Sequence, residues 1–133
     1  MNTANEIIKY LNLEPHPERG YYRRTYKSSF GEEDRAFTSA IYYLLEGGRF
    51  ARLHRMDSDE LWLWHAGAPL TLEVNAPEEP ANSVILGNDI LKNEAPQILV
   101  PANHWQRARS EGAWTLVSCV VSPEFTFKSY EII

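Results

Sequence analysis

The chain has 133 residues and a formal net charge of −5, with 44% hydrophobic and 23% charged residues. These values are ordinary for a single globular domain that buries its own core, so we treat residues 1–133 as one domain. The acidic balance without a basic stripe excludes nucleic acid as an expected partner, because phosphate binding needs clustered positive charge. No run of 18 apolar residues occurs, and we therefore expect no membrane partner.

Cys119 is the single cysteine, and it lies in the apolar run LVSCVV. It has no partner for an internal disulfide, and its neighbours predict a buried small hydrophobic residue rather than a nucleophile. Residues 1–13 lack the cationic start and apolar segment of a signal peptide. Together these features predict a cytoplasmic protein.

The first element is a short helix over about residues 3–12. Thr3 can cap it, and Glu6 three positions later completes a capping box. Ile7, Ile8 and Leu11 then share one face. The segment EPHPERG ends the helix, because two prolines and a glycine do not continue it.

From about residue 20 to the C-terminus the pattern is that of strands, rich in Tyr, Thr and Val and broken by turn clusters. Eight or nine short strands without a second helical pattern predict an all-β sandwich or barrel. The strand-like segments are YYRRTYKS (21–28), FTSAIYYLL (37–45), RFARLHR (49–55), ELWLWHA (60–66), PLTLEVNA (69–76), SVILG (83–87), PQILVP (96–101), AWTLVSCVV (113–121) and FTFKSYEII (125–133).

Two segments carry a specific spacing of chemistry-bearing residues. In GGRFARLHRMDSDELWLWHAG, Gly48 precedes His54 by six positions, Glu60 follows six later, and Gly67 follows after seven more. This resembles the first signature of the cupin superfamily, and VPANHWQ (100–106) resembles the second. The rest of the sequence, from Leu11 to the end, also resembles small single-domain cupins of unassigned function. The resemblance implies an all-β fold, a cupin double-stranded β-helix (an RmlC-like jelly-roll barrel) with a short N-terminal α-helix.

The departures from those signatures concern the metal ligands. The resemblance implies that metal-binding cupins use two His and a Glu from the first signature and a His from the second. Here His54 and Glu60 match, whereas Met56 and Gln106 stand at the other two positions. Divalent transition metals prefer imidazole and carboxylate ligands, so we expect no metal cofactor. The residues that remain as candidate metal ligands are His54, Glu60, Gln106 and the neighbouring His104.

Strand alternation predicts a cavity instead. If Glu60 points inward, so does Trp62, and His54 and Met56 share the inward face of their own segment. Gln106 joins them if it keeps the orientation of the ligand it replaces. Aromatic walls with a few convergent polar groups are typical of a small-molecule pocket.

The predicted strand YYRRTYKS adds a candidate anion contact. In a regular strand Arg23 and Thr25 share one face, and the resemblance favours Arg23 as the arginine that faces the pocket. A guanidinium there would hold a carboxylate or phosphate through two parallel hydrogen bonds. We therefore include both residues among the predicted ligand-binding set.

Three functions follow from this set. The first is a metal-independent isomerase or epimerase acting on a sugar, sugar-nucleotide or keto-acid-like substrate, with His54 as base, Glu60 orienting it, and a tyrosine from 22–26 or 42–43 as acid. The second is a non-catalytic small-molecule binding or sensor module, which suits Met56 and Gln106. The third is a metal-dependent, dioxygenase-like cupin with a reduced ligand set. The resemblance also implies a homodimer.

Overall fold

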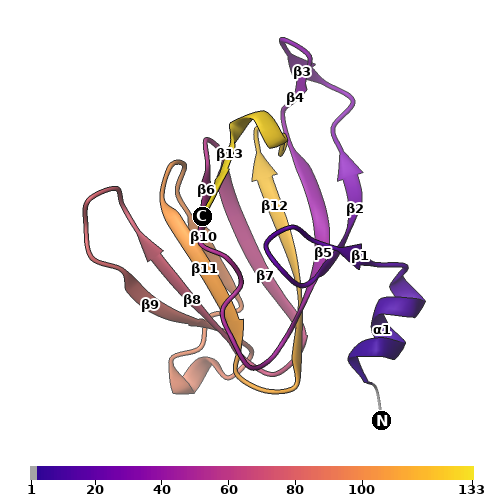
Figure 1. Ribbon diagram of the computed structural model, residues 1–133, viewed down its shortest axis with the longest axis vertical. Coiled ribbons are helices and arrows are strands. Elements are labelled where there is room, and N and C mark those ends of the chain that lie inside the picture. Colours follow the sequence, from indigo (N-terminus) through magenta and orange to yellow (C-terminus); the bar gives the residue numbers. More distant parts are fainter. Residues whose placement is uncertain (1–2) are drawn as a thin grey trace.

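The computed structural model describes residues 3–133 and consists of two β-sheets that face each other, with one short α-helix beside them (Figure 1). Neighbouring strands in each sheet run antiparallel. The six-stranded sheet contains, in spatial order, β1 (Glu14–Pro15), β2 (Tyr21–Lys27), β5 (Ser39–Glu46), β12 (Trp114–Ser122), β7 (Asp59–Gly67) and β10 (Gln97–Val100).

The second sheet has five strands, and a small separate hairpin completes the β-structure. The five-stranded order is β13 (Tyr130–Ile132), β6 (His54–Met56), β11 (Trp105–Ser110), β8 (Leu70–Asn75) and β9 (Asn82–Leu86). The hairpin pairs β3 (Gly31–Glu32) with β4 (Arg35–Ala36). In the described chain the ladders form separate sheets rather than one closed hydrogen-bonded barrel. The prediction of a mostly β fold with one helix is confirmed.

The helix α1 (Ala4–Leu11) begins and ends as the sequence predicts. The Thr3 side chain accepts a hydrogen bond from the Glu6 amide, and the Glu6 side chain accepts one from the Thr3 amide, so the capping box is complete. Asn12 ends the helix in the left-handed conformation at φ 57°. No helix among residues 3–133 is long and apolar enough to cross a membrane.

The core lies between the two sheets and follows the period-two pattern of the strands. In β12 every second residue is buried, which places Val117 and Cys119 inward and confirms Cys119 as a buried free thiol. The core cluster combines large rings with aliphatic side chains, and comprises Tyr43, Leu45, Ala51, Trp62, Leu70, Leu72, Leu86, Val100, Ala108, Val117 and Cys119.

Two predicted strands are shorter than the sequence indicates. In RFARLHR the strand β6 begins only at His54. The residues before it join no regular ladder, because the backbone N–H groups of Ala51 and Arg52 donate to carbonyls in two different segments, those of Ala108 and Glu18. In FTFKSYEII a 3₁₀ turn, η2 (Phe127–Ser129), precedes β13. A second 3₁₀ turn, η1 (Ile90–Lys92), and the β3–β4 hairpin lie between segments that the sequence predicts as strands.

Candidate functional site

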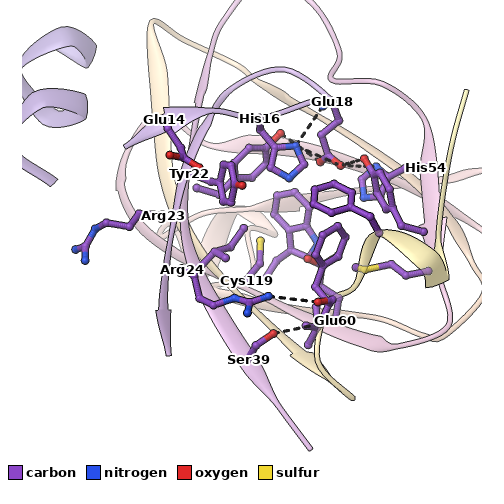
Figure 2. A pocket seen from close by; sticks show the side chains of 18 of the residues that line it. Glu14, His16, Glu18, Tyr22, Arg23, Arg24, Ser39, His54, Glu60 and Cys119 are labelled. Atoms are coloured by element: carbon purple, nitrogen blue, oxygen red, sulfur yellow. Dashed lines mark hydrogen bonds and ion pairs between the residues drawn. The ribbon is translucent and has the colours of Figure 1, made fainter. Parts of the chain in front are cut away.

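A cavity of about 300 Å³ opens between the two sheets (Figure 2). Its walls come from the loop before β2, from β2, β5, β6, β7 and β12, and from the segment that follows β12. The charged and polar side chains that line it include His16, Glu18, Arg24, His54 and Glu60. Rings of Tyr22, Tyr43, Trp62, Phe125, Phe127 and Tyr130 supply much of the remaining surface. This combination of an aromatic wall and a few polar groups suits a small organic ligand.

The carboxylate of Glu18 occupies the middle of the polar wall, and only 5% of this residue is exposed. Tyr130 donates its hydroxyl proton to Glu18 Oε2 at 2.7 Å. The Tyr43 hydroxyl lies 2.7 Å from the Arg19 carbonyl and 3.3 Å from Glu18 Oε1. Buried carboxylates are costly unless they are paired, and these donors stabilise the charge.

His54 is the second member of this network. Its Nδ1 lies 3.3 Å from Glu18 Oε2 and 3.1 Å from the carbonyl oxygen of Arg52. Both neighbours are acceptors, so Nδ1 carries a proton, and in the neutral ring Nε2 presents its lone pair. In residues 3–133 every fully buried side-chain nitrogen or oxygen has a partner, and none of the hydrogen bonds involves His54 Nε2. This nitrogen therefore borders the cavity and is open to a ligand.

Glu60 lies on β7 and lines the cavity, with 6% of the residue exposed. Its Oε1 accepts a hydrogen bond from Gln106 Nε2 at 2.8 Å, and Gln106 Oε1 in turn accepts one from Trp62 Nε1 at 3.0 Å. Burial raises the pKa of Glu60 to about 7, against the smaller opposing effect of His54. Near neutral pH this carboxyl group exists in both its protonated and its ionised forms.

Comparison with known proteins settles the family. Residues 5–133 match the family model described as Cupin superfamily (DUF985). The chain belongs to this cupin family. No curated protein matches it.

Two solved structures resemble this cupin over nearly its whole length. A crystal structure of a protein from Shewanella oneidensis shares 38% identity with a TM-score of 0.95, covering 100% of this chain and 85% of that one. A hypothetical protein from Leishmania major shares 34% identity with a TM-score of 0.90, covering 99% of this chain and 88% of that one. Oxalate decarboxylase from Bacillus subtilis has a TM-score of 0.69 at 12% identity, covering 90% of this chain and 29% of that one. This last likeness shows the cupin fold alone.

The structure brings most of the predicted cupin site residues together. His54, Met56, Glu60 and Trp62 all line the cavity, and each is at least nine-tenths buried. Gln106 is also buried, but it lies behind the cavity wall and connects Glu60 to Trp62. The expectation that Glu60 orients His54 is not met by the geometry, because the carboxylate that reaches Nδ1 belongs to Glu18.

The structure orients the two neighbouring arginines differently. Both residues border the cavity, but Figure 2 shows Arg23 directed away from it and Arg24 directed toward it. The Arg23 guanidinium donates from Nε to the Leu11 carbonyl at 2.7 Å. Cross-strand partners explain the difference, since Arg24 pairs with the cavity residue Ile41 whereas Arg23 pairs with Tyr42, which lies outside the cavity lining.

Two further predicted residues lie outside the cavity lining. A register shift between Arg24 and Tyr26 interrupts the alternation at Thr25, and the Thr25 hydroxyl donates to the Ala40 carbonyl at 3.3 Å. The Nδ1 atom of His104 lies 3.2 Å from the Ala102 carbonyl oxygen, in the loop before β11. Of the tyrosines proposed as acid, Tyr22 and Tyr43 line the cavity.

Sequence reasoning missed Glu18, His16 and Tyr130. The first two lie in the segment EPHPERG, where the prolines and glycine dominate the pattern and indicate only a helix end. Tyr130 lies at the start of β13, and only the pairing of that strand with β6 brings its ring beside His54, at a centroid distance of 5.5 Å. No local sequence signal predicts that pairing.

The cupin fold implies a metal centre, and the residues present do not fit one. Met56 supplies a thioether and Gln106 an amide that is already engaged on both sides, by Glu60 and by Trp62. His54 Nδ1 is engaged by Glu18 and a backbone carbonyl, which leaves Nε2 as the one imidazole nitrogen that His54 could offer to a metal. Within residues 3–133 no group of three or more His, Cys, Asp or Glu side chains is arranged to hold a metal ion. One imidazole nitrogen and one carboxyl group make an incomplete ligand set for a divalent metal.

Proposed function

We propose that this cupin binds a small polar metabolite in the cavity and that His54 acts on it as a general base, in a metal-independent isomerase- or epimerase-like proton transfer. The observation that carries the proposal is the position of His54 Nδ1 between Glu18 Oε2 and the Arg52 carbonyl. This arrangement fixes the tautomer and leaves Nε2 unprotonated at the cavity.

The network around His54 suits a base that gains and loses a proton. Removing a proton from a ligand converts the imidazole to an imidazolium, and the adjacent Glu18 carboxylate stabilises the new positive charge. A neutral imidazole accepts a proton on its free nitrogen and the imidazolium can give it back, which is what a general base requires. The hydroxyl of Tyr130, 2.7 Å from Glu18, holds the carboxylate in place.

The rest of the cavity indicates the kind of ligand. A volume of about 300 Å³ lies at the lower end of the range for small-molecule sites, which favours a compact metabolite. Arg24 gives one side of the cavity a cationic group. Its Nη1 lies 3.4 Å from Glu124 Oε2, and its Nη2 lies 3.3 Å from the Phe125 carbonyl oxygen. A carboxylate or phosphate on the ligand would meet this guanidinium.

The experiment measures exchange of carbon-bound hydrogen with solvent deuterium. Keto acids, sugar phosphates and nucleotide sugars are first ranked by thermal shift, since a ligand at 100 times its dissociation constant stabilises the fold by about 2.7 kcal/mol. Ligands that bind are then incubated with the protein in deuterium oxide. We expect exchange that His54→Gln reduces by about 100-fold or more. The matched control is His65→Gln, since His65 lies outside the cavity lining and contacts the Ser118 hydroxyl.

A non-catalytic binding or sensor module is the second candidate. Met56 and Trp62 give part of the cavity wall a neutral, largely apolar surface, which can fit a ligand by shape but supplies no acid, base or nucleophile. The same experiment separates the two functions. A ligand that stabilises the wild type without any exchange supports binding alone and removes His54 from the role of base.

We also retain as proposals the homodimer and the cytoplasmic location that the sequence and the family resemblance suggest. Light scattering of the purified protein tests the first, with twice the monomer mass expected. Fractionation of cells that express the tagged protein tests the second, with recovery in the cytoplasmic fraction expected.

A further inference from the structure

A second imidazole, that of His16, borders the same cavity on the other side of Glu18 (Figure 2). His16 lies in the turn between β1 and β2, and its backbone N–H donates to the Gly20 carbonyl at 2.9 Å. Gly20 adopts φ +79°, and a Cβ there would lie 2.7 Å from the Leu44 carbonyl oxygen, so the turn depends on glycine. The ring packs against Tyr22 at 4.8 Å and Tyr43 at 5.4 Å between centroids.

Backbone contact fixes the tautomer of His16. The Glu18 N–H donates to His16 Nδ1 at 3.1 Å, and a nitrogen that accepts this bond carries no proton. The neutral ring therefore carries its proton on Nε2. Burial lowers the pKa of His16, which favours the neutral form further.

The two histidines thus have opposite polarities at the cavity. His54 presents an unprotonated Nε2, as shown above, whereas His16 presents an Nε2–H group. No hydrogen bond in the described chain involves His16 Nε2, and every fully buried side-chain nitrogen or oxygen there has a partner, so this group also borders open space. Glu18 Oε2 lies 3.3 Å from His54 Nδ1 and 3.8 Å from His16 Nδ1, so the two imidazoles flank one carboxylate at the wall of the same cavity.

We infer that His16 donates a hydrogen bond to the carbonyl oxygen of the substrate while His54 removes a proton from the adjacent carbon. The inference rests on the proposed function and deepens it, because it names the substrate class. The ligand is a carbonyl compound with a hydrogen on the carbon next to the carbonyl, such as a keto acid or a hydroxyketone.

The step balances without any oxidant or further reactant. The carbon-bound proton moves to His54 Nε2, and the electron pair of the broken C–H bond forms the carbon–carbon double bond of an enolate. The carbonyl π pair moves onto oxygen, where the His16 N–H holds the new negative charge. His16 keeps its proton throughout, and a neutral donor suffices for this task. Return of a proton from His54 to the same face of that carbon regenerates the ligand and, after exchange with solvent, labels it, whereas protonation of the carbon from its opposite face inverts it and completes an epimerisation.

The first arm of the test needs no ligand. Long-range ¹H–¹⁵N spectra of the imidazoles in the free wild-type protein report which ring nitrogen is protonated. At neutral pH we expect a proton on Nε2 of His16 and on Nδ1 of His54. A proton on Nδ1 of His16, or a charged His16 ring, overturns the inference whether or not any variant folds.

The second arm compares glycolohydroxamate, which mimics an enediolate, with the ground-state analogue glycolamide. We expect the wild type to prefer the hydroxamate by about 10-fold or more, since tighter binding of the charged intermediate is what catalysis requires. His16→Phe keeps the aromatic packing and should abolish the preference, whereas His16→Gln retains an N–H donor and should keep part of it. Equal binding by the wild type, or a preference that survives in His16→Phe, overturns the inference.

Failure of this inference is distinguishable from failure of the proposed function. Exchange that proceeds equally fast in the wild type and in His16→Phe removes the role of His16 and leaves His54 as the base. Absence of exchange in the wild type with every carbonyl ligand that binds overturns both.

Discussion

The carboxylate of Glu18 lies 3.3 Å from Nδ1 of His54, and this contact joins the loop before β2 to the first residue of β6. Both side chains are almost fully buried, at 6% and 4% exposed. A buried carboxylate beside an imidazole is stable only when further donors satisfy it, and Tyr130 and Tyr43 do so here. The arrangement resembles the way in which many enzymes orient a histidine base.

The first prediction concerns Glu18→Gln, which keeps the size of the side chain and removes its charge. The carboxamide no longer stabilises an imidazolium at His54, so we expect the rate of deuterium exchange to fall by about 100-fold. Glu46→Gln is the matched control, because Glu46 is exposed at the end of β5 and lies outside the cavity lining. An unchanged exchange rate in Glu18→Gln contradicts this role.

The second prediction concerns Tyr130→Phe, which removes the hydrogen bond of 2.7 Å to Glu18 and keeps the ring. Hydrogen bonds to buried charged groups stabilise proteins more than neutral ones do, and we expect the free energy of unfolding to fall by about 2 kcal/mol. Urea denaturation measures this change. Tyr26→Phe, at a residue that is 54% exposed, should have little effect. Equal losses in the two variants would show that the Tyr130 hydroxyl does not stabilise the carboxylate.

The third prediction follows from the pKa of Glu60, which burial raises from 4.5 to about 7. The folded state binds this proton more tightly than the unfolded chain does, so the resulting stabilisation is complete below pH 4.5 and is lost as the pH rises through about 7. The Glu60→Gln variant has no carboxyl group at this position to bind or release a proton, so it serves as the reference. We expect the free energy of unfolding of the wild type, relative to this variant, to fall by about 3 kcal/mol between pH 4.5 and about pH 8. A difference that stays constant over this range contradicts the assignment.

The fourth prediction uses the neighbouring arginines as a matched pair. Arg24 is directed toward the cavity and Arg23 away from it, so Arg24→Gln should weaken binding of an anionic ligand by about 10-fold, whereas Arg23→Gln should not. Isothermal titration with an anionic ligand and its uncharged analogue measures the effect. A loss of affinity in the Arg23 variant instead would restore the assignment made from the sequence.

The fifth prediction concerns metal removal. Because Met56 and Gln106 stand where metal-binding cupins have histidines, we expect ligand binding and exchange to be unchanged after treatment with a chelator and dialysis. The control is the same protein with added Mn²⁺, Fe²⁺ or Zn²⁺. Loss of exchange on chelation, restored by one of these ions, would favour the metal-dependent alternative.

The sequence predicts the parts of this fold whose signals are local. The capping box at Thr3 and Glu6 predicts α1, and the alternation in residues 113–121 predicts the inward face of β12. The spacing of His54 and Glu60 predicts the cupin family and places both residues at one cavity. In each case neighbouring residues in the chain carry the physical cause.

The remaining features depend on contacts between distant segments. Glu18 becomes a functional candidate only because the turn before β2 lies against β6, and a loop with two prolines gives no sign of that. Arg24 rather than Arg23 faces the cavity because of the register between β2 and β5. Tyr130 reaches Glu18 only after η2 turns the chain into β13. Register and strand pairing are tertiary properties, which strand alternation alone does not determine.

The most direct measurement is a crystal structure of the protein with the ligand that gives the largest thermal shift. We expect electron density inside the cavity, with a carbon or oxygen atom of the ligand in contact with His54 Nε2. Density for that ligand only on the outer surface, or in the cavity with His54 Nε2 turned away from it, would contradict the role of His54 as the base of this cavity.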